Sequence, residues 1–281
     1  MDTLCDILVL GAGPAGISAA LTAKARGRSV MLLSNDPMES PLAKAKQVDN
    51  YPGLVGLSGR ELLKAMMDGL GDIPLRVGRA QTILPMGDGF MVGAGPDMYT
   101  ARSLILATGM ALAKPFPGEA ELLGKGVSYC ATCDGMLYRG RPVAVIGLAP
   151  DAEEEARFLR SIGCEAEYFD RTRARQYAIK GKDRVTALEA DGVEYPVDGV
   201  FILRNTVASA VLLPGLSVES GHIAVDDSMA ASIPGVFAAG DCVGRPYQVG
   251  KAVGEGNLAA LGADAWLKEK EKTKINEDRG L

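Results

Sequence analysis

The sequence is poor in the residues and patterns that several common classes of protein require. It contains a single histidine, His222, among 281 residues, so we expect neither a Ser-His-Asp site nor a histidine-rich metal site. Its formal net charge is −5, whereas nucleic-acid binding needs a basic surface, and we exclude that class. No apolar run reaches the roughly 18 residues of a membrane span. The N-terminus has no basic region before its first apolar stretch, which predicts a cytoplasmic protein without a membrane anchor.

The five cysteines are too few and too scattered for a disulfide framework of the secreted type. Cys130 and Cys133 are the only close pair, in the segment CATCDG. Such a pair can be a redox dithiol, half of a zinc site or two small buried residues. The remaining cysteines provide no second pair of ligands, so zinc is disfavoured and we predict no metal.

The N-terminal 35 residues have the pattern of a βαβ unit. A buried parallel strand over residues 5–11 is followed by a helix over 17–27 and a strand over 29–34. Between the first strand and the helix lies G-x-G-x-x-G, with Gly11, Gly13 and Gly16. Such glycines permit a tight turn and close approach of a pyrophosphate to the helix N-terminus, which predicts dinucleotide binding. Ser34 stands where an acid often holds a ribose and Asp36 follows it, so the ribose contact stays open.

A second βαβ unit follows in the middle of the chain. A strand over 141–147, a helix over 151–163 and a strand over 165–170 repeat the pattern of the first unit. Further strands are expected at 199–204 and 235–241. The last long helix is expected over 254–272. The cysteine pair therefore lies between two Rossmann-like units.

Six segments in this order resemble the low-molecular-weight, flavin-dependent thioredoxin reductases. They are GAGPAGISAA (11–20), VDNYPGLVGLSGRELL (48–63), ATG (107–109), CATCDG (130–135), GVFAAGDC (235–242) and YQVGKAVGEG (247–256). The resemblance implies an α/β fold with two Rossmann-like, three-layer domains, the second inserted in the first. It implies an FAD-binding domain over 1–112 and 219–281, an inserted C-x-x-C domain over 113–218, and a homodimer.

The resemblance also implies roles for particular residues. Cys130 would attack the substrate disulfide, Cys133 would lie nearer the flavin, and Asp134 would act as acid and base. Asp241 would hydrogen-bond the ribityl chain of FAD. The residues implied to bind FAD are Gly11, Gly13, Pro14, Ala15, Gly16, Asn50, Thr108, Gly109, Gly240, Asp241, Gln248 and Val249.

The second unit departs from the NADPH-dependent members of the family. Its turn reads GLAPDA (147–152), with Leu148 and Ala149 in place of glycines and with Pro150, which has no N–H. The basic cluster that would hold a 2′-phosphate is replaced by DRT (170–172), although an acid there could accept an NAD ribose. Glu153, Glu154 and Glu155 suit a helix N-terminus and would repel a phosphate. These departures resemble the members that lack NADPH-binding motifs, among them the ferredoxin-dependent flavin thioredoxin reductases.

These observations predict an FAD-dependent disulfide reductase acting on thioredoxin or a thioredoxin-like protein, with reduced ferredoxin rather than NADPH as the electron donor. The basic stretch 171–184 is the candidate docking face for ferredoxin. One alternative keeps the disulfide chemistry with NADH or a second flavin as the donor. Another is a non-catalytic flavoprotein that senses thiol state. The sole tryptophan, Trp266, either packs the last helix or covers a face of the flavin.

Overall fold

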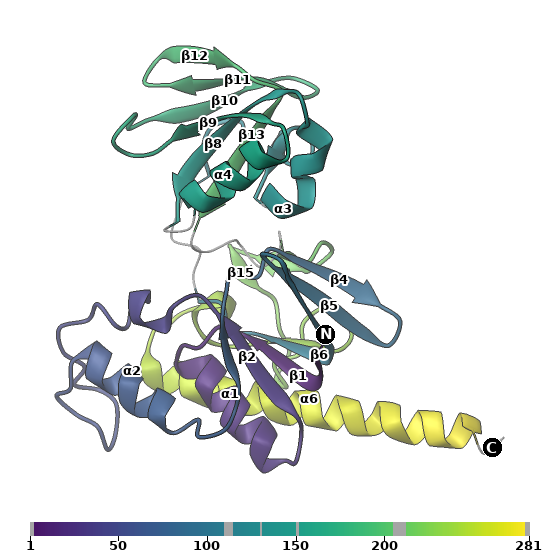
Figure 1. Ribbon diagram of the computed structural model, residues 1–281. Coiled ribbons are helices and arrows are strands. Elements are labelled where there is room, and N and C mark those ends of the chain that lie inside the picture. The colour runs from purple at the N-terminus through teal and green to yellow at the C-terminus, as the bar shows by residue number, and fades with distance from the viewer. Residues whose placement is uncertain (1–2, 110–114, 130, 150–151, 205–211, 279–281) are drawn as a thin grey trace. The chain divides into compact units, whose positions relative to one another are not determined.

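The computed structural model describes residues 3–109, 115–129, 131–149, 152–204 and 212–278 of the chain. The chain forms two compact units (Figure 1), one built from Met1–Ala111 with Ala208–Leu281 and the other from Leu112–Val207. The domain boundaries predicted from the sequence lie after residues 112 and 218. Assignment of FAD to the first unit and of the dithiol to the second stays a prediction.

The first unit is built on a seven-stranded sheet in the order β3-β2-β1-β6-β5-β4, with β16 also paired to β6. The strands β3, β2, β1, β6 and β16 run parallel, and β5 and β4 extend the sheet as an antiparallel hairpin. The bounds are β1 Thr3–Leu10, β2 Val30–Ser34, β3 Leu75–Val77, β4 Thr82–Met86, β5 Gly89–Ala94, β6 Asp97–Leu106 and β16 Val236–Ala238. A separate pair is formed by β14 Val218–Glu219 and β15 His222–Ile223.

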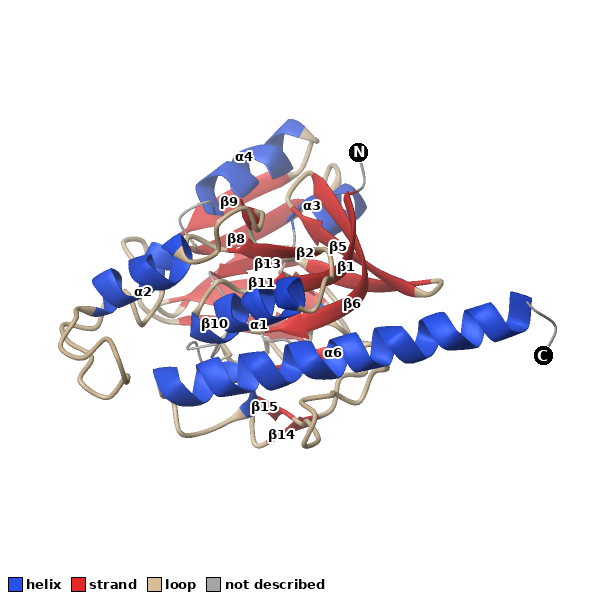
Figure 2. Cartoon of the chain, turned by 90° about the horizontal axis from the view of Figure 1, so that it is seen from below, coloured by secondary structure: helices blue, strands red, loops and turns tan. Residues whose placement is uncertain are grey.

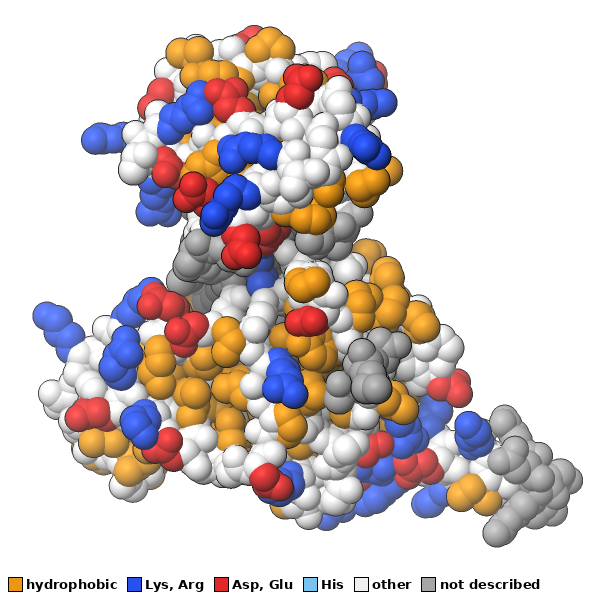
Figure 3. Space-filling view, viewed as in Figure 1, with side chains coloured by type: hydrophobic (Ala, Val, Ile, Leu, Met, Phe, Trp, Pro, Cys, Tyr) orange, Lys and Arg blue, Asp and Glu red, His pale blue; other side chains and the backbone are white. Residues whose placement is uncertain are grey.

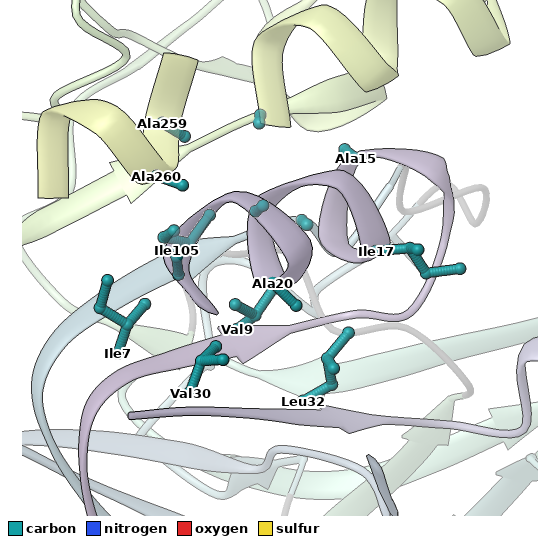
Figure 4. Close-up of a cluster of buried hydrophobic side chains, with 14 of the residues drawn as sticks. Ile7, Val9, Ala15, Ile17, Ala20, Val30, Leu32, Ile105, Ala259 and Ala260 are labelled. Atoms are coloured by element: carbon teal, nitrogen blue, oxygen red, sulfur yellow. The ribbon is translucent and has the colours of Figure 1, made fainter. Parts of the chain in front are cut away.

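Two helices of the first unit, α1 Pro14–Ala25 and α6 Val249–Asp278, lie alongside each other (Figure 2). The buried strand residues Ile7, Val9 and Ile105 and a series of alanines from both helices form one cluster (Figure 4). Small side chains let the helix backbones approach, since a Cβ at Gly256 would lie 2.1 Å from the Ala15 carbonyl oxygen. Helix α6, at Val249–Asp278, is longer at both ends than the predicted 254–272, and Gly256 lies inside it at this contact.

The rest of the first unit consists of short helical elements. Helix α2 spans Gly59–Asp68 and begins with a capping box. The Ser58 hydroxyl accepts from the Glu61 N–H, and the Glu61 carboxylate accepts from the Ser58 N–H at 2.9 Å. Two 3₁₀ turns, η1 Pro37–Glu39 and η3 Gly240–Val243, complete the unit.

The second unit has a parallel sheet in the order β7-β13-β8-β9 and a three-stranded antiparallel sheet β10-β11-β12. One buried cluster, with Ala144, Ile146 and Leu188, lies between strands of the two sheets, and another, with Val143 and Val145, faces the helices. Alternate residues of β8 thus point into opposite clusters, which gives three layers. The bounds are β7 Val127–Ser128, α3 Ala131–Asp134, η2 Gly135–Tyr138, β8 Pro142–Leu148, α4 Ala152–Ser161, β9 Glu165–Phe169, β10 Tyr177–Gly181, β11 Val185–Ala190, β12 Val193–Pro196 and β13 Gly199–Arg204.

A buried carboxylate ties α6 to the end of α1. The Asp264 side chain is 3% exposed and accepts from Arg26 Nε at 3.0 Å, Arg28 Nε at 2.8 Å and Lys268 Nζ at 2.8 Å. Burial alone would raise the pKa of Asp264, but the hydrogen bonds from Lys268, Arg28 and Arg26 lower it to about 2. The charged form of Asp264 therefore stabilises the folded state.

We expect this carboxylate to make the stability of the protein pH-dependent. Because the folded pKa lies below the unfolded value, its contribution is full above pH 5 and is lost as the pH falls from about 4 toward about 2. The loss should be about 2 kcal/mol. Urea unfolding of the FAD-loaded protein at a series of pH values should show this component, and D264N should lack it. The exposed Asp72, which pairs with Lys24, gives the control D72N, for which we expect little change. An unchanged pH profile in D264N would contradict the prediction.

Candidate functional site

The glycine turn between β1 and α1 is closed by the chain itself on one side and open on the other. Gly11 has a φ of +113°, and a Cβ there would lie 2.2 Å from the Ala107 carbonyl oxygen. A Cβ at Gly16 would lie 1.9 Å from the Gly11 carbonyl oxygen. A Cβ at Gly13, in contrast, would meet nothing within 4 Å. Gly11 and Gly16 are therefore required by the fold, while Gly13 faces open space.

Helix α1 begins at this open side. Pro14 is its first residue, Gly13 precedes it without a side-chain cap, and no acid lies in the first turn. The backbone N–H groups and the positive end of the helix dipole are thus suited to a phosphate. The Ser34 hydroxyl accepts from the Ala12 N–H at 3.1 Å and closes the turn, while the Asp36 carboxylate caps η1 through the Met38 N–H at 2.9 Å.

The second predicted FAD motif lies against the first. Gly240 has a φ of +86°, and a Cβ there would lie 2.9 Å from the Cβ of Ala15. Because β1, β6 and β16 are neighbouring parallel strands, their carboxyl ends bring Gly11, Gly109 and Gly240 to one edge of the sheet. Ligands of open α/β sheets bind at this edge.

Two residues that sequence analysis missed hold the Gly240 turn on α6. The Lys251 ammonium donates to the carbonyl oxygens of Gly240 at 3.1 Å and Gly244 at 2.7 Å. The Glu255 carboxylate accepts from the Gly240 N–H at 2.9 Å and pairs with Lys251 at 2.9 Å. Their opposite charges four residues apart were the available signal, but the helix predicted over 254–272 left Lys251 outside it. The pKa of the neighbouring Asp241 is raised above its ordinary value, chiefly because the side chain is partly buried. The positive charge of Lys251 opposes this rise, and the negative charge of Glu255 adds to it.

The remaining predicted FAD residues are distributed around this edge. Thr108 and Gly109 follow β6, and Val249 begins α6. The Gln248 carbonyl oxygen accepts from the Ala252 N–H at 3.0 Å in the first turn of α6. Asn50 is exposed in the segment before α2. The structure therefore brings together the glycine turns and the start of α6, and it leaves Asn50 in a separate exposed loop.

The second unit carries the C-x-x-C segment. Cys130 lies outside the described residues, and Cys133 belongs to α3. The Asp134 carboxylate is half-buried and accepts from the Ser128 hydroxyl at 2.7 Å. The buried Cys164 thiol donates to the Gly135 carbonyl oxygen at 3.3 Å. Both ends of the segment from 128 to 135 are thus fastened to the unit.

The βα turn after β8 differs from the turn after β1. A Cβ at Gly147 would lie 2.1 Å from the Tyr168 hydroxyl oxygen, so this glycine makes room for a side chain of the protein. Ala149 packs against the helix-side cluster. Pro150 lies outside the described residues. The Asp170 carboxylate accepts from the Thr172 hydroxyl at 2.6 Å and from the Thr172 N–H at 2.9 Å, which lowers its pKa. The Tyr168 side chain thus occupies the space beside Gly147 at the end of β8, and Asp170 closes a turn of its own.

The other cysteines and the tryptophan have packing roles. Cys5, Cys164 and Cys242 are buried free thiols, and burial raises the pKa of Cys5 to about 12 and of Cys242 to about 11. Trp266 packs against the cluster of the first unit, where a Cβ at Gly235 would lie 2.9 Å from its ring. The described residues contain no group of three His, Cys, Asp or Glu side chains that could hold a metal. Nor does any helix among them have the length and apolarity needed to cross a membrane.

The paired glycine motifs at one sheet edge are typical of a dinucleotide-binding protein. The family model of the pyridine nucleotide-disulphide oxidoreductases matches residues 5–176 and 169–256. A thioredoxin reductase of Listeria innocua is 31% identical over 95% of this chain and 95% of its own. One from Aquifex aeolicus is 32% identical over 96% of both. The chain therefore belongs to the flavin-dependent thioredoxin reductases within that family.

Solved structures agree with this assignment. A ferredoxin-flavin thioredoxin reductase from Clostridium acetobutylicum is 37% identical, with a TM-score of 0.88 over 96% of this chain and 100% of its own. The atypical thioredoxin reductase TRi from Desulfovibrio vulgaris Hildenborough is 29% identical, with a TM-score of 0.71 over 94% and 98%. The predictions of family, α/β fold class, flavin-dependent oxidoreductase and FAD as cofactor are confirmed.

We expect Gly13 to matter for FAD and not for the fold. Because a Cβ at Gly13 meets no protein atom and its φ of −80° suits any residue, G13A should leave the stability of the apoprotein within about 0.5 kcal/mol of wild type. The added methyl group would instead block close approach of the pyrophosphate, and FAD affinity should fall at least about tenfold. Titration of apoprotein with FAD, followed by flavin fluorescence, measures this. The exposed Gly254, which is equally open, provides the control G254A; equal affinity of both variants would refute the prediction.

The burial of three thiols predicts a simple labelling pattern. In the reduced native protein at pH 8, iodoacetamide should leave Cys5, Cys164 and Cys242 unmodified, because buried thiols of raised pKa carry little thiolate. All five should react in urea. Peptide mass analysis identifies the modified residues, and fast labelling of any of the three buried thiols would be the contrary result.

Proposed function

We propose that this enzyme reduces the disulfide of thioredoxin or a thioredoxin-like protein through Cys130 and Cys133, with reduced ferredoxin rather than NADPH as its electron donor. The observation that carries the proposal is at the carboxyl end of β8, where the Tyr168 side chain occupies the space beside Gly147, the first residue of the altered GLAPDA segment. Solved relatives named ferredoxin-flavin thioredoxin reductases, at 37% and 39% identity, support the same donor.

The disulfide chemistry follows from two thiols at this spacing. The Cys130 thiolate attacks one sulfur of the acceptor disulfide, and the other acceptor sulfur leaves as a thiolate that takes up a proton. The Cys133 thiolate then attacks the mixed disulfide, releases the second acceptor thiol and leaves Cys130 joined to Cys133. Two electrons pass to the acceptor in total. Asp134, oriented by the Ser128 hydroxyl, is the carboxyl group assigned to proton transfer with the leaving thiols.

The first unit is proposed to hold FAD, which when bound supplies electrons in pairs to a disulfide and accepts them singly from a one-electron donor. The α1 N-terminus at Gly13, Pro14, Ala15 and Gly16 is assigned to the pyrophosphate. Asp241 is assigned to the ribityl chain, with Lys251 and Glu255 holding its turn on α6. The other residues assigned to FAD are Gly11, Asn50, Thr108, Gly109, Gly240, Gln248 and Val249.

The second unit offers little to a nicotinamide nucleotide. Asp170 uses one carboxylate oxygen, Oδ1, for Thr172 and Arg173, so a ribose could bind without competing with these bonds only at Oδ2. The Arg173 guanidinium pairs with Glu167 and stacks 4.2 Å above the Phe169 ring, so it is occupied within the unit. These contacts disfavour both NADPH and NADH, which makes the NADH alternative the weaker one.

The segment 171–184 is the proposed docking face for ferredoxin. Arg171, Arg175, Lys182 and Arg184 are exposed, while Lys180 pairs with Glu189 at 2.9 Å. Acidic side chains also lie on the face of this unit that Figure 3 shows. An acidic one-electron carrier would be attracted to the exposed cations, and its encounter rate would fall as salt rises.

A protein acceptor is supported by the residues that follow the dithiol. Met136 is 59% exposed and Leu137 is 71% exposed, both in η2 directly after the C-x-x-C turn. Adjacent exposed apolar side chains are typical of a protein contact. A cytoplasmic location and a homodimer complete the proposal.

The decisive experiment compares electron donors in the absence of oxygen. We expect reduced ferredoxin to bleach the flavin absorbance and to support thioredoxin reduction, while NADPH and NADH in excess leave the flavin oxidised over minutes. C133S should still be bleached by ferredoxin but should not reduce thioredoxin. Bleaching by NADPH within seconds would overturn the donor proposal. Bleaching by ferredoxin without any thioredoxin reduction in the wild type would favour the sensor alternative.

A further inference from the structure

Helix α6 carries a lysine at a place where helices ordinarily disfavour one. Lys251 is the third residue of this 30-residue helix, so its ammonium group lies at the positive end of the helix dipole. Its ion-pair partner, Glu255, follows four residues later, which is the less favourable order of the two charges along a helix. The helix alone therefore does not account for Lys251.

The three N–H groups of the Lys251 ammonium are matched by three oxygen atoms. These are the carbonyl oxygens of Gly240 at 3.1 Å and Gly244 at 2.7 Å, and Oε2 of Glu255 at 2.9 Å. The same Oε2 accepts from the Gly240 N–H at 2.9 Å. Both side chains are only 17% exposed, whereas surface ion pairs stand in solvent and contribute little. The pair thus bridges the two ends of the turn from Gly240 to Gly244.

Asp241 is the second residue of this turn and is partly buried. Burial disfavours the charged form of a carboxyl group. The positive charge of Lys251 opposes that effect on Asp241, and the negative charge of Glu255 adds to it. Because Gly240 is fastened through both its N–H and its carbonyl group, the position of Asp241 next to it depends on the same two side chains.

Few other ionisable groups face the turn. The buried Cys242 thiol has its pKa raised to about 11 by burial and is neutral near pH 7. Strand β15 lies against the turn, and its His222 is engaged with the Tyr247 hydroxyl at 2.8 Å. Within the part of the chain that the structure describes, the charges acting on Asp241 are those of the two α6 side chains.

We propose that Lys251 is a positioning residue for the cofactor: with Glu255 it fixes the turn that carries Asp241, and its charge keeps the Asp241 carboxyl group ionised. This inference rests on the proposed assignment of Asp241 to the ribityl chain of FAD. A carboxylate accepts hydrogen bonds from hydroxyl groups more strongly than the neutral acid does. FAD affinity should therefore fall as the pH drops through the pKa of Asp241. Loss of the Lys251 charge should move that fall to higher pH, and loss of the Glu255 charge should move it to lower pH.

The test compares FAD affinity at pH 5 and pH 8. Apoprotein of each variant is titrated with FAD, and flavin fluorescence gives the Kd at both pH values. K251M removes the positive charge, and its ratio of Kd at pH 5 to Kd at pH 8 should be at least about threefold larger than in the wild type. E255Q keeps an oxygen for the Gly240 N–H but removes the negative charge, and its ratio should not exceed that of the wild type. Equal ratios in K251M and E255Q would overturn the proposal.

Further variants separate the charge from the contacts. Lys64 and Asp68 form an exposed ion pair of the same spacing on α2, so K64M and D68N should leave both Kd values within about twofold of wild type. K251R keeps the charge and should retain the wild-type ratio, even where altered contacts shift the Kd at both pH values. If K251M does not fold, K251Q, which keeps N–H donors without the charge, takes its place with the same expected ratio.

The variant D241N distinguishes this inference from the assignment on which it rests. Without an ionisable carboxyl group, D241N should bind FAD more weakly than the wild type at pH 8, with little difference between the two pH values. If D241N binds FAD as tightly as the wild type, the assignment of Asp241 fails and the inference fails with it. If D241N weakens FAD binding while K251M and E255Q give equal ratios, only the inference about Lys251 fails. None of these measurements uses an electron donor or thioredoxin, so the proposed reductase activity stands or falls separately.

Discussion

Close backbone approach around α1 is the constraint on which the cofactor site depends. Gly16 allows α1 to lie on the Gly11 carbonyl group, Gly256 allows α6 to lie on the Ala15 carbonyl group, and Gly240 lies against the Ala15 methyl group. Any Cβ at these positions would lie within 3 Å of another atom. The glycine turn, the Gly240 turn and the start of α6 therefore meet at one place because side chains are absent there. Gly13 is the exception, because a Cβ there would meet no protein atom within 4 Å.

The second unit has the same βαβ arrangement, but the space beside its first glycine is not open. Its first glycine, Gly147, is retained, but the Tyr168 side chain occupies the space beside it. The first turn of its helix α4 carries three carboxylates, and the Glu155 carboxylate accepts a hydrogen bond from the Ala131 N–H of α3. The parallel sheet, helix α4 and the packed contact between α3 and α4 hold the C-x-x-C segment in the second unit. The second unit thus keeps the βαβ architecture, with the Tyr168 side chain beside its first glycine.

The sequence predicted the parts of the molecule that depend on local pattern. Both βαβ units, the glycine turn and the cysteine pair followed from residue spacing, and the expected strands at 141–147 and 199–204 match β8 and β13 closely. The start of α6 was placed too late, at residue 254, whereas the helix begins at Val249 and Gly256 packs on α1. The contacts of Tyr168 with Gly147 and of Glu155 with Ala131 join residues about 20 apart, so spacing could not reveal them.

The two chemical tasks are separated in the chain. Every described contact that fastens the C-x-x-C segment comes from the second unit: Ser128 from β7, Glu155 from α4 and Cys164 from the start of β9. Every contact that shapes the glycine turns comes from the first unit. The contacts that fasten the C-x-x-C segment and the contacts that shape the glycine turns therefore use separate sets of residues, so a substitution in one set leaves the described contacts of the other set in place.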